Sequence, residues 1–567
     1  SASNVNIILG ATSGNVTATV TADTASNLNS ALTNATTGTD VLTLTVNGAT
    51  AQATDLIDLD GKTSVDVSVT ATAVSGTFAN LNTVYVTNVA NYVNLGDENV
   101  TITDTTSASN VNIILGATSG NVTAIVTADT AAALNTALTN ATTGTDALTL
   151  TINDTTLTSV SDLLALDGKT NVAVNASSVN SISETIANLN TAYNSAGISG
   201  LGNENISITN TGTITAAQIN DLLGETSGTI TLVGSGNLAI TMTSGQTLDL
   251  SGITNSLSGN LSITDSTGNE TIIGTSANDT LTLSSGNDTV NLGDGSDVIN
   301  TTIANLNTAD NISDAGTTGT DTLNITNSGT IDSANLIDVS GIEILNLSGG
   351  NDTITFDDTA EFNAFRNNFT DIIDAGGNDT LSFGSTAVTG DLDFSKLGEF
   401  ENLNLSSVSD NLTISGDEPD NINGLGGDDQ FTLNFSNVSN FNINGGSGED
   451  KVNITGTSSS ISTDTNIFGA GAFDNIEALD LTATDLVVGA DTSDGGTNAE
   501  YTLTGALINS WTSSNSLKLT LDADAASKFE FTNNYGTKYG GDDSGTTAIT
   551  NGSYTLDNGA TLIVDGL

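Results

Sequence analysis

The sequence predicts a mainly β protein, an elongated parallel β-solenoid with short helices in its N-terminal repeats and a β domain at its C-terminus. Three observations support this prediction. A sixteen-residue stretch, Ser1–Val16, recurs unchanged at Ser107–Val122. Many short segments alternate apolar and polar residues, as strands with one buried face do. Nine-residue units follow one another in register from residue 265 to residue 300. Stacked turns of this kind bury one continuous apolar column.

Composition excludes several functional classes. The 567 residues include 65 Asp and Glu against 8 Lys and Arg, a net charge of −57. This excludes binding of nucleic acid or an anionic membrane through a basic surface. The absence of His and Cys removes zinc–histidine sites, disulfides and Ser-His-Asp triads. The excess Asp must be solvated or neutralised by a hard cation such as Ca²⁺. With no run of about 18 apolar residues, no segment is expected to span a membrane.

The N-terminal part is expected to contain a first repeat at 1–106, a second at 107–214 and a truncated third at 215–264, where the solenoid continues. Within the first repeat, period-two alternation predicts strands over 16–20, 41–46 and 65–69. Ala25, Leu28, Ala31 and Leu32 recur at helical spacing and predict a short helix over 23–34. A string of β-sandwich domains of about 100 residues is the alternative, but so many short helices between strands favour the solenoid.

The nine-residue units read DSTGNETII, GTSANDTLT, LSSGNDTVN and LGDGSDVIN. Position 6 is acidic in every unit and position 8 is apolar and expected to point inward. The acidic residues are Glu270, Asp279, Asp288 and Asp297, and the apolar ones are Ile272, Leu281, Val290 and Ile299. Glycines at position 4, such as Gly286 and Gly295, permit tight turns whose carbonyls are free to bind a cation. Because Ca²⁺ takes six or more oxygen ligands, neighbouring turns must share them. Plain Asx turns between strands are the alternative interpretation.

This pattern resembles the RTX nonapeptide repeat, G-G-x-G-x-D-x-U-x. The resemblance implies a parallel β-roll that binds Ca²⁺, with Gly286, Gly295 and the four acidic residues at the sites. Further matches extend the implied calcium-binding region over 265–481. They add as metal ligands Asp321, Asp352, Asp379, Asp429 and Asp450. The sequence departs from the family pattern at Ala277, which replaces Gly, at Glu270, which replaces Asp, and at positions 1 and 2, which are mostly not Gly.

An acidic-apolar phrase recurs between these units, as GIEILNL (341–347), FENLNL (400–405) and NIEALDL (475–481). Its alternation is expected to place Ile344 and its equivalents inward, with the Glu at a turn or strand edge. Such phrases are similar to those of bacterial surface-layer proteins and large RTX adhesins. The 106-residue repeats resemble those of marine cyanobacterial cell-surface proteins.

The composition changes after residue 482, because aromatic residues concentrate in the segment 482–567. They include Tyr501, Trp511, Phe529, Phe531, Tyr535, Tyr539 and Tyr554. One interpretation is a compact terminal β domain that caps the solenoid. The other is an assembly or anchoring surface, since exposed aromatic side chains favour interfaces. The apolar end TLIVDGL resembles the C-terminal secretion signal of RTX proteins.

Together these features predict a secreted, non-enzymatic structural protein at the cell surface, a surface-layer subunit that folds and assembles with Ca²⁺. Its expected partners are copies of itself, and cell-surface polysaccharide is a further candidate. The first alternative is a spacer segment of an RTX adhesin. The second is a β-helix enzyme that acts on polysaccharide through two carboxylates.

Overall fold

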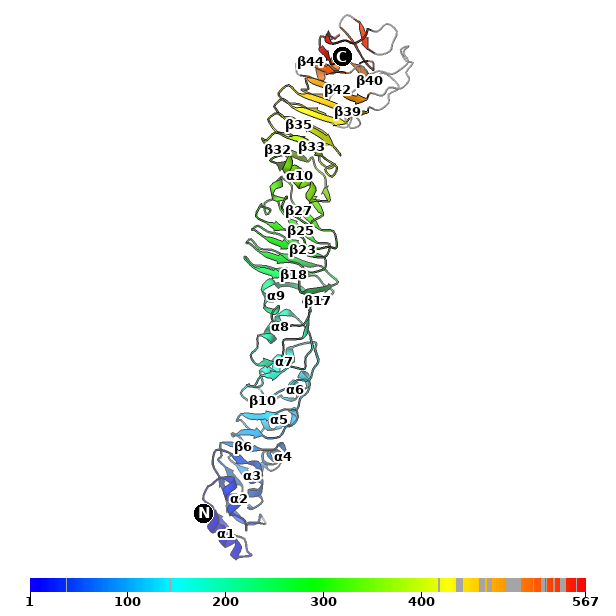
Figure 1. The fold of residues 1–567 in the computed structure, drawn as a ribbon. Coiled ribbons are helices and arrows are strands. Elements are labelled where there is room, and N and C mark those ends of the chain that lie inside the picture. The colour runs from blue at the N-terminus through cyan, green and yellow to red at the C-terminus, as the bar shows by residue number, and fades with distance from the viewer. Residues whose placement is uncertain are drawn as a thin grey trace. The chain divides into compact units, whose positions relative to one another are not determined.

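The computed structural model describes residues 1–567 except 37, 142–143, 417–418, 435–441, 458–464, 467–471, 486–500, 513, 522–525, 527, 534–535, 541–546 and 557. The chain divides into two compact units. Unit 1 comprises residues 1–238 and 252–259, and unit 2 comprises residues 239–251 and 260–567. Each unit consists mainly of stacked strands, as the successive arrows of β23, β25 and β27 show for unit 2 (Figure 1).

Unit 1 is a stack of short parallel strands. Thr17 of β1 (Thr17–Thr19) pairs with Val41 of β2 (Val41–Thr43), and hydrogen bonds between adjacent turns join residues 24 apart, as Val16 and Asp40 do. A sheet of three strands contains β3 (Thr45–Val46), β5 (Val67–Val69) and β7 (Tyr92–Val93). Larger sheets have the orders β10 (Ala147–Thr149), β9 (Val122–Ile125), β8 (Asn99–Ile102), β6 (Ala73–Gly76), β4 (Ala51–Gln52), and β11 (Thr156–Leu157), β13 (Ser181–Glu184), β15 (Asn205–Ile208), β17 (Ile230–Gly234), β20 (Ile253–Leu257).

Short helices connect these strands. The predicted helix over 23–34 is α2 (Ala25–Ala31), which begins after Thr24, whose side chain accepts the Asn27 N–H. Ala25 and Leu28 are buried, as the helical spacing predicts. In the second copy, α6 (Ala131–Ala137) begins in the same way after Thr130. Since the strands of unit 1 pair in parallel through these connections, the solenoid prediction is confirmed and the sandwich alternative is wrong.

Unit 2 is built from longer stacks of parallel strands. One sheet contains, in order, β21 (Leu261–Thr264), β23 (Asp279–Thr282), β25 (Val298–Thr301), β27 (Thr322–Ile325), β29 (Ile344–Leu347) and β31 (Asp371–Asp374). A second contains β19 (Thr247–Asp249), β22 (Thr271–Ile273), β24 (Thr289–Asn291) and β26 (Asn311–Ile312). In the nonapeptide segment, the hydrogen bond from Asp279 to Asp297 spans 18 residues. One turn there therefore consists of two nonapeptides.

Two further sheets continue unit 2. One contains β28 (Thr330–Asp332), β30 (Thr353–Phe356), β32 (Thr380–Phe383), β34 (Asn402–Asn404), β36 (Asn421–Asn423), β38 (Asn442–Asn444) and β41 (Phe473–Asp474). The other contains β33 (Thr389–Asp393), β35 (Asn411–Ser415), β37 (Gln430–Asn434), β39 (Lys451–Thr457), β42 (Ala478–Asp485), β44 (Ser516–Thr520), β48 (Thr561–Asp565) and β47 (Gly552–Thr555). Among strand pairs with a described register, antiparallel pairing occurs at β47–β48 and between β45 (Phe529–Thr532) and β46 (Lys538–Gly540).

The core of the nonapeptide segment consists of the position-8 side chains, as predicted. Ile272, Leu281, Val290 and Ile299 are all buried. The prediction for the acidic-apolar phrase has the wrong phase, because Ile344 is only half-buried whereas Ile342, Leu345 and Leu347 are buried. The residue before the Glu faces inward, and the alternation of the strand restarts two residues after the Glu.

A helix that the sequence analysis did not predict interrupts the strands of unit 2. It is α10 (Thr359–Asn368), which begins after Asp358, whose side chain accepts the Glu361 N–H. Its Phe362 and Phe365 are buried against Phe356 of β30, with ring centroids 5.3 and 5.5 Å apart respectively. This aromatic cluster fills the wider turn that the helix creates.

The C-terminal aromatic residues are largely internal. Trp511, Phe529, Phe531 and Tyr501 are buried, and Phe531 lies 5.2 Å from Tyr539 between ring centroids. Tyr535 lies outside the described residues. The buried side chains of Tyr501, Trp511, Phe529 and Phe531 lie inside unit 2 and cannot supply an exposed aromatic surface for assembly.

Candidate metal centres

Acidic side chains lie at the start of successive strands in unit 2 and form ladders along the stack. The Asp279 N–H donates to Oδ1 of Asp297 (2.7 Å), and the Asp297 N–H donates to Oδ1 of Asp321 (2.7 Å). Parallel stacking brings each amide opposite the equivalent residue of the next turn, where a carboxylate makes a strong, charge-assisted acceptor. Each acid therefore joins two turns through one of its oxygens.

Three more ladders follow the same rule. In one, the Glu270 N–H donates to Asp288 and the Asp288 N–H donates to Asp310. In another, the Asp352 N–H donates to Asp379. In the last, the Asp410 N–H donates to Asp429 and the Asp429 N–H donates to Asp450.

The Glu residues of the acidic-apolar phrases end three of these ladders, because each accepts the backbone N–H of the ladder aspartate one turn earlier. Glu343 accepts the Asp321 N–H, Glu401 the Asp379 N–H and Glu477 the Asp450 N–H. The sequence pattern predicted each Glu only as a turn or strand-edge residue. The distance along the chain from each Glu to the preceding nonapeptide acid was the sequence signal that could have identified these pairs.

In six ladder residues, and in the neighbouring Asp265 and Asp374, one carboxylate oxygen is buried without a donor. Buried oxygens without a hydrogen-bond partner belong to Asp265, Glu270, Asp288, Asp297, Asp374, Asp379, Asp429 and Asp450. A buried, unpaired carboxylate oxygen is strongly disfavoured unless a cation or a proton compensates it. The second oxygens are thus suited to hold hard cations.

Burial raises the pKa of several of these aspartates, and neighbouring acids raise it further. The pKa of Asp297 and of Asp429 rises to about 7, and that of Asp288 and of Asp450 to about 6. Burial also raises the pKa of Asp265, Asp321 and Asp374 to about 7. At neutral pH these groups need positive charge nearby to stay ionised together.

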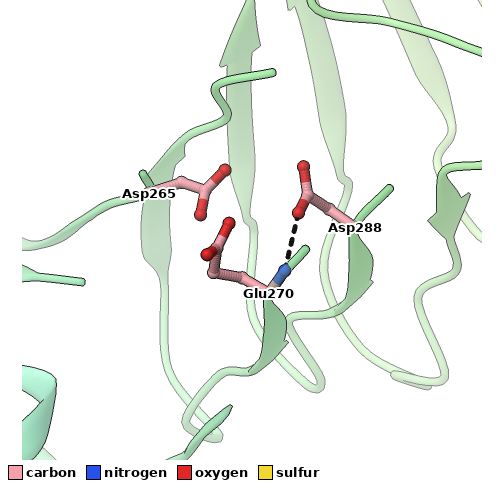
Figure 2. Close-up of side chains that lie close together, drawn as sticks. All are labelled: Asp265, Glu270 and Asp288. Atoms are coloured by element: carbon pink, nitrogen blue, oxygen red, sulfur yellow. Dashed lines mark hydrogen bonds between the residues drawn. The ribbon is translucent and has the colours of Figure 1, made fainter. Parts of the chain in front are cut away.

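The first centre combines Asp265, Glu270 and Asp288, which converge from three adjoining segments (Figure 2). All three are buried, and one oxygen from each lies within 4.8 Å of the others. Glu270 Oε1 accepts from the Gly245 N–H (2.7 Å) and the Ser266 hydroxyl (2.9 Å), while Asp265 Oδ2 accepts the Ser284 N–H (3.1 Å). Each acid thus uses one oxygen for the backbone framework and keeps the other for a ligand.

Two further centres also consist of three acidic residues each. Asp297, Asp314 and Asp321 form the second, and Asp352, Asp374 and Asp379 form the third. Asp314 accepts the Gly293 N–H (2.7 Å), which fixes its carboxylate beside the ladder. Three carboxylates that converge on one small space provide the oxygen ligands that Ca²⁺, a hard cation, prefers.

Asp265, Asp314 and Asp374 were missed by sequence reasoning. Asp265 and Asp374 occupy position 1 of their nonapeptides, where the family pattern has Gly, five residues before Glu270 and Asp379 respectively. An acidic residue at position 1 was therefore a readable signal. Asp314 lies outside the nonapeptide, and only the folded turn brings it to the site.

Some ladder acids are satisfied within the protein. Asp279 Oδ2 accepts from both the N–H (2.7 Å) and the hydroxyl (3.1 Å) of Thr275. Ser406 donates to Asp410 through its N–H and its hydroxyl. In both cases the donor lies four residues before the acid and takes the role that a cation has elsewhere, and neither Asp279 nor Asp410 belongs to any of the three acidic centres. In the third centre the Ser348 hydroxyl donates to Asp352 Oδ2 (3.2 Å), so the oxygens without a donor there belong to Asp374 and Asp379.

The predicted site glycines lie where stacked turns touch. A Cβ atom on Gly286 would lie 1.5 Å from the carbonyl oxygen of Gly268. Gly295 has a φ of +145°, and its Cβ would lie 2.9 Å from the carbonyl carbon of Ala277. The Gly286 carbonyl accepts from the Asn307 side chain. These glycines permit close stacking.

Asp429 and Asp450 share the ladder geometry but, among the described residues, join no group of three acids. Asp429 Oδ1 accepts the Asp410 N–H and Asp450 Oδ1 accepts the Asp429 N–H, both at 2.8 Å. The N–H of the exposed Glu449 donates to the neighbouring Asp428 (3.0 Å).

Comparison with known proteins identifies the nonapeptide segment. The family model of the RTX calcium-binding nonapeptide repeat, in four copies, matches residues 264–299. No curated protein matches the chain. Such repeats bind calcium, so the predictions of an RTX-type β-roll and of Ca²⁺ as the bound ion are confirmed. They are typical of secreted extracellular proteins, and among the described residues no helix is both long and apolar enough to cross a membrane. The likeness to surface-layer proteins stays a prediction.

Two isosteric substitutions should separate ligand acids from satisfied acids. We expect Asp297→Asn to remove one calcium ion or weaken its binding at least about tenfold, because an amide places a donor where the cation binds. Asp279→Asn should leave the calcium stoichiometry unchanged, because its amide oxygen can still accept from Thr275. Calorimetric Ca²⁺ titration of both full-length variants measures this difference. Equal losses would contradict the division between the two kinds of turn.

Proposed function

We propose that the protein is a secreted, non-enzymatic structural protein of the cell surface, a surface-layer subunit that Ca²⁺ folds and links to its neighbours. The observation that supports this proposal best is the recurrence of buried carboxylate oxygens without a donor in unit 2, from Asp265 to Asp450. A chain that repeats one structural device over so many turns is suited to a mechanical role. A single catalytic centre would require only one such arrangement.

Charge supports the assembly step. With 65 acidic and 8 basic residues, close packing of identical subunits is opposed by repulsion that acts over about 8 Å at physiological ionic strength. Exposed acids such as Asp428 and Glu449 lie beside the ladder acids Asp429 and Asp450. Ca²⁺ bound between two such surfaces neutralises both and adds directional carboxylate contacts.

We expect millimolar Ca²⁺ to drive assembly of the purified chain, whereas Na⁺ at matched ionic strength does not. Light scattering follows the assembly, and electron microscopy distinguishes ordered sheets from irregular aggregates. Monovalent salt only screens repulsion, so equal assembly in Na⁺ would show that specific calcium bridges are not needed.

A spacer segment of an RTX adhesin is the second candidate function. The near-identical copies at the N-terminus favour it, since α2 and α6 begin at equivalent Thr residues and each is followed by an equivalent strand, β2 and β10. Repeating one unit adds length without adding a new site. A chain that binds its calcium and remains monomeric at high Ca²⁺ would favour this function over a surface layer.

A further inference from the structure

The first N-terminal repeat contains a buried glutamate with one unsatisfied oxygen. Glu98, directly before β8, is 2% exposed. Its Oε2 accepts from the Tyr85 hydroxyl (3.1 Å) and from the Gly96 N–H (2.8 Å). Its Oε1 is buried and has no hydrogen-bond partner. Burial, and then the Glu98 charge, raise the pKa of Tyr85, so the tyrosine remains a donor and the glutamate keeps the acceptor role.

Glu98 lines a surface cavity of about 370 Å³. The other lining residues are the segment 69–72, Asn94 and the exposed Asp97. Asn94 has a φ of +57° and is held there by a bond from its Nδ2 to the Ser68 hydroxyl (2.9 Å). The lining thus offers two carboxylates, an amide oxygen, and the carbonyl and hydroxyl oxygens of Thr70 and Thr72, and it contains no Lys or Arg.

The second repeat supplies an internal comparison. Glu204 occupies the equivalent place before β15, in the sequence LGNEN where the first repeat has LGDEN. Both its oxygens are hydrogen-bonded, because the Gly202 N–H is shared between Oε1 (3.1 Å) and Oε2 (2.8 Å), and Oε2 also accepts from the Tyr193 hydroxyl (2.8 Å). Asn203 replaces Asp97. Where the second acid is absent, the buried glutamate is satisfied by the protein alone.

We propose that Glu98 and Asp97 form a Ca²⁺ site in unit 1, with Asn94 and the segment 69–72 as further oxygen donors. A hard divalent cation is the ligand that these groups select, because two carboxylates and neutral oxygens make up the lining and one carboxylate oxygen is buried without compensation. The site lies outside residues 264–299 and does not use the nonapeptide pattern. It is also independent of the proposed assembly function.

Tyrosine-sensitised Tb³⁺ luminescence of the full chain can test this site selectively. Tb³⁺ is a luminescent substitute for Ca²⁺, and Tyr85 donates directly to Glu98. The chain has no tyrosine between residues 194 and 500, where the acidic ladders lie. We expect Glu98→Gln and Asp97→Asn each to reduce the tyrosine-sensitised signal, and equilibrium dialysis to show one calcium ion fewer per chain. The matched control Glu204→Gln should change neither quantity.

The result is decisive even if burial makes Glu98→Gln unstable, because Asp97 is exposed and Asp97→Asn keeps the shape of the side chain. An unchanged signal and unchanged calcium stoichiometry in Asp97→Asn would overturn the proposal. An equal loss in Glu204→Gln would overturn it as well, since the two repeats would then not differ. Failure of assembly in Ca²⁺ would refute the proposed function without affecting this site.

Discussion

Removal of Ca²⁺ at pH 8 is expected to unfold residues 265–453 while the strands of unit 1 persist. Asp288, Asp297, Asp379, Asp429 and Asp450 each contain a buried carboxylate oxygen without a donor, and without a cation these charges repel one another in a poorly solvated interior. Each site occupied at 100 times its dissociation constant contributes about 2.7 kcal/mol to the folded state. Circular dichroism and thermal melting of the full chain, with and without chelator, measure the loss.

The pH dependence provides the control for this experiment. The folded pKa values of about 6 to 7 for Asp288, Asp297 and Asp429 lie above the ordinary value of 3.8. Calcium-free protein should therefore be most stable below about pH 4, where the carboxyls are protonated in both states, and should lose that stability as pH rises through about 6 to 7. A calcium-free melting temperature that is the same at pH 5 and pH 8 would contradict the electrostatic explanation.

Gly286→Ala is expected to destabilise unit 2 by more than about 3 kcal/mol, because the new methyl group would overlap the backbone of the adjacent turn. Its Cβ would lie 1.5 Å from the Gly268 carbonyl oxygen, a contact that only separation of the two turns can relieve. Such separation also moves Asp288, two residues later, away from its Glu270 partner. Chemical denaturation in saturating Ca²⁺ measures the stability change, and a calcium titration should show weaker binding.

Gly349→Ala is the control. Gly349 lies at position 3 of its nonapeptide, one position before the equivalent of Gly286, and a Cβ there would meet its nearest neighbour, Ala375, at an ordinary 3.5 Å. We expect a change within about 0.5 kcal/mol. If both substitutions were tolerated equally, close stacking at position 4 would not be a requirement of the roll.

The parts of the fold that were predictable are those encoded by short periods. The in-register nonapeptides fix both the inward face, with Ile272 and Leu281 buried, and the acidic position before each strand. Side chains two residues apart on a strand, or nine residues apart in the nonapeptides, have the same orientation in the roll, so one sequence is enough to predict which of them face inward. The helix α2 was predictable for the same reason, because its apolar spacing and its cap are local.

The composition of the sites was less predictable, because it depends on contacts between turns. Asp314 reaches Asp297 and Asp321 only through the folded turn. Thr275 and Ser406 satisfy Asp279 and Asp410 through hydroxyl groups that the repeat pattern leaves unspecified. The unsatisfied oxygen of Glu98 likewise follows from the donors around it, and these differ from those around Glu204 although the local sequences are nearly the same.

Amide hydrogen exchange with and without Ca²⁺ tests most directly whether bound calcium holds the ladders together. The N–H groups of Glu270, Asp279, Asp288 and Asp297 each donate to a carboxylate one turn away. With Ca²⁺ at pH 8 we expect slow exchange for peptides that contain these amides. After chelation we expect fast exchange there, with little change in the strands of the second repeat in unit 1. Equal protection of the four ladder amides in both conditions would show that bound calcium does not hold the ladders together.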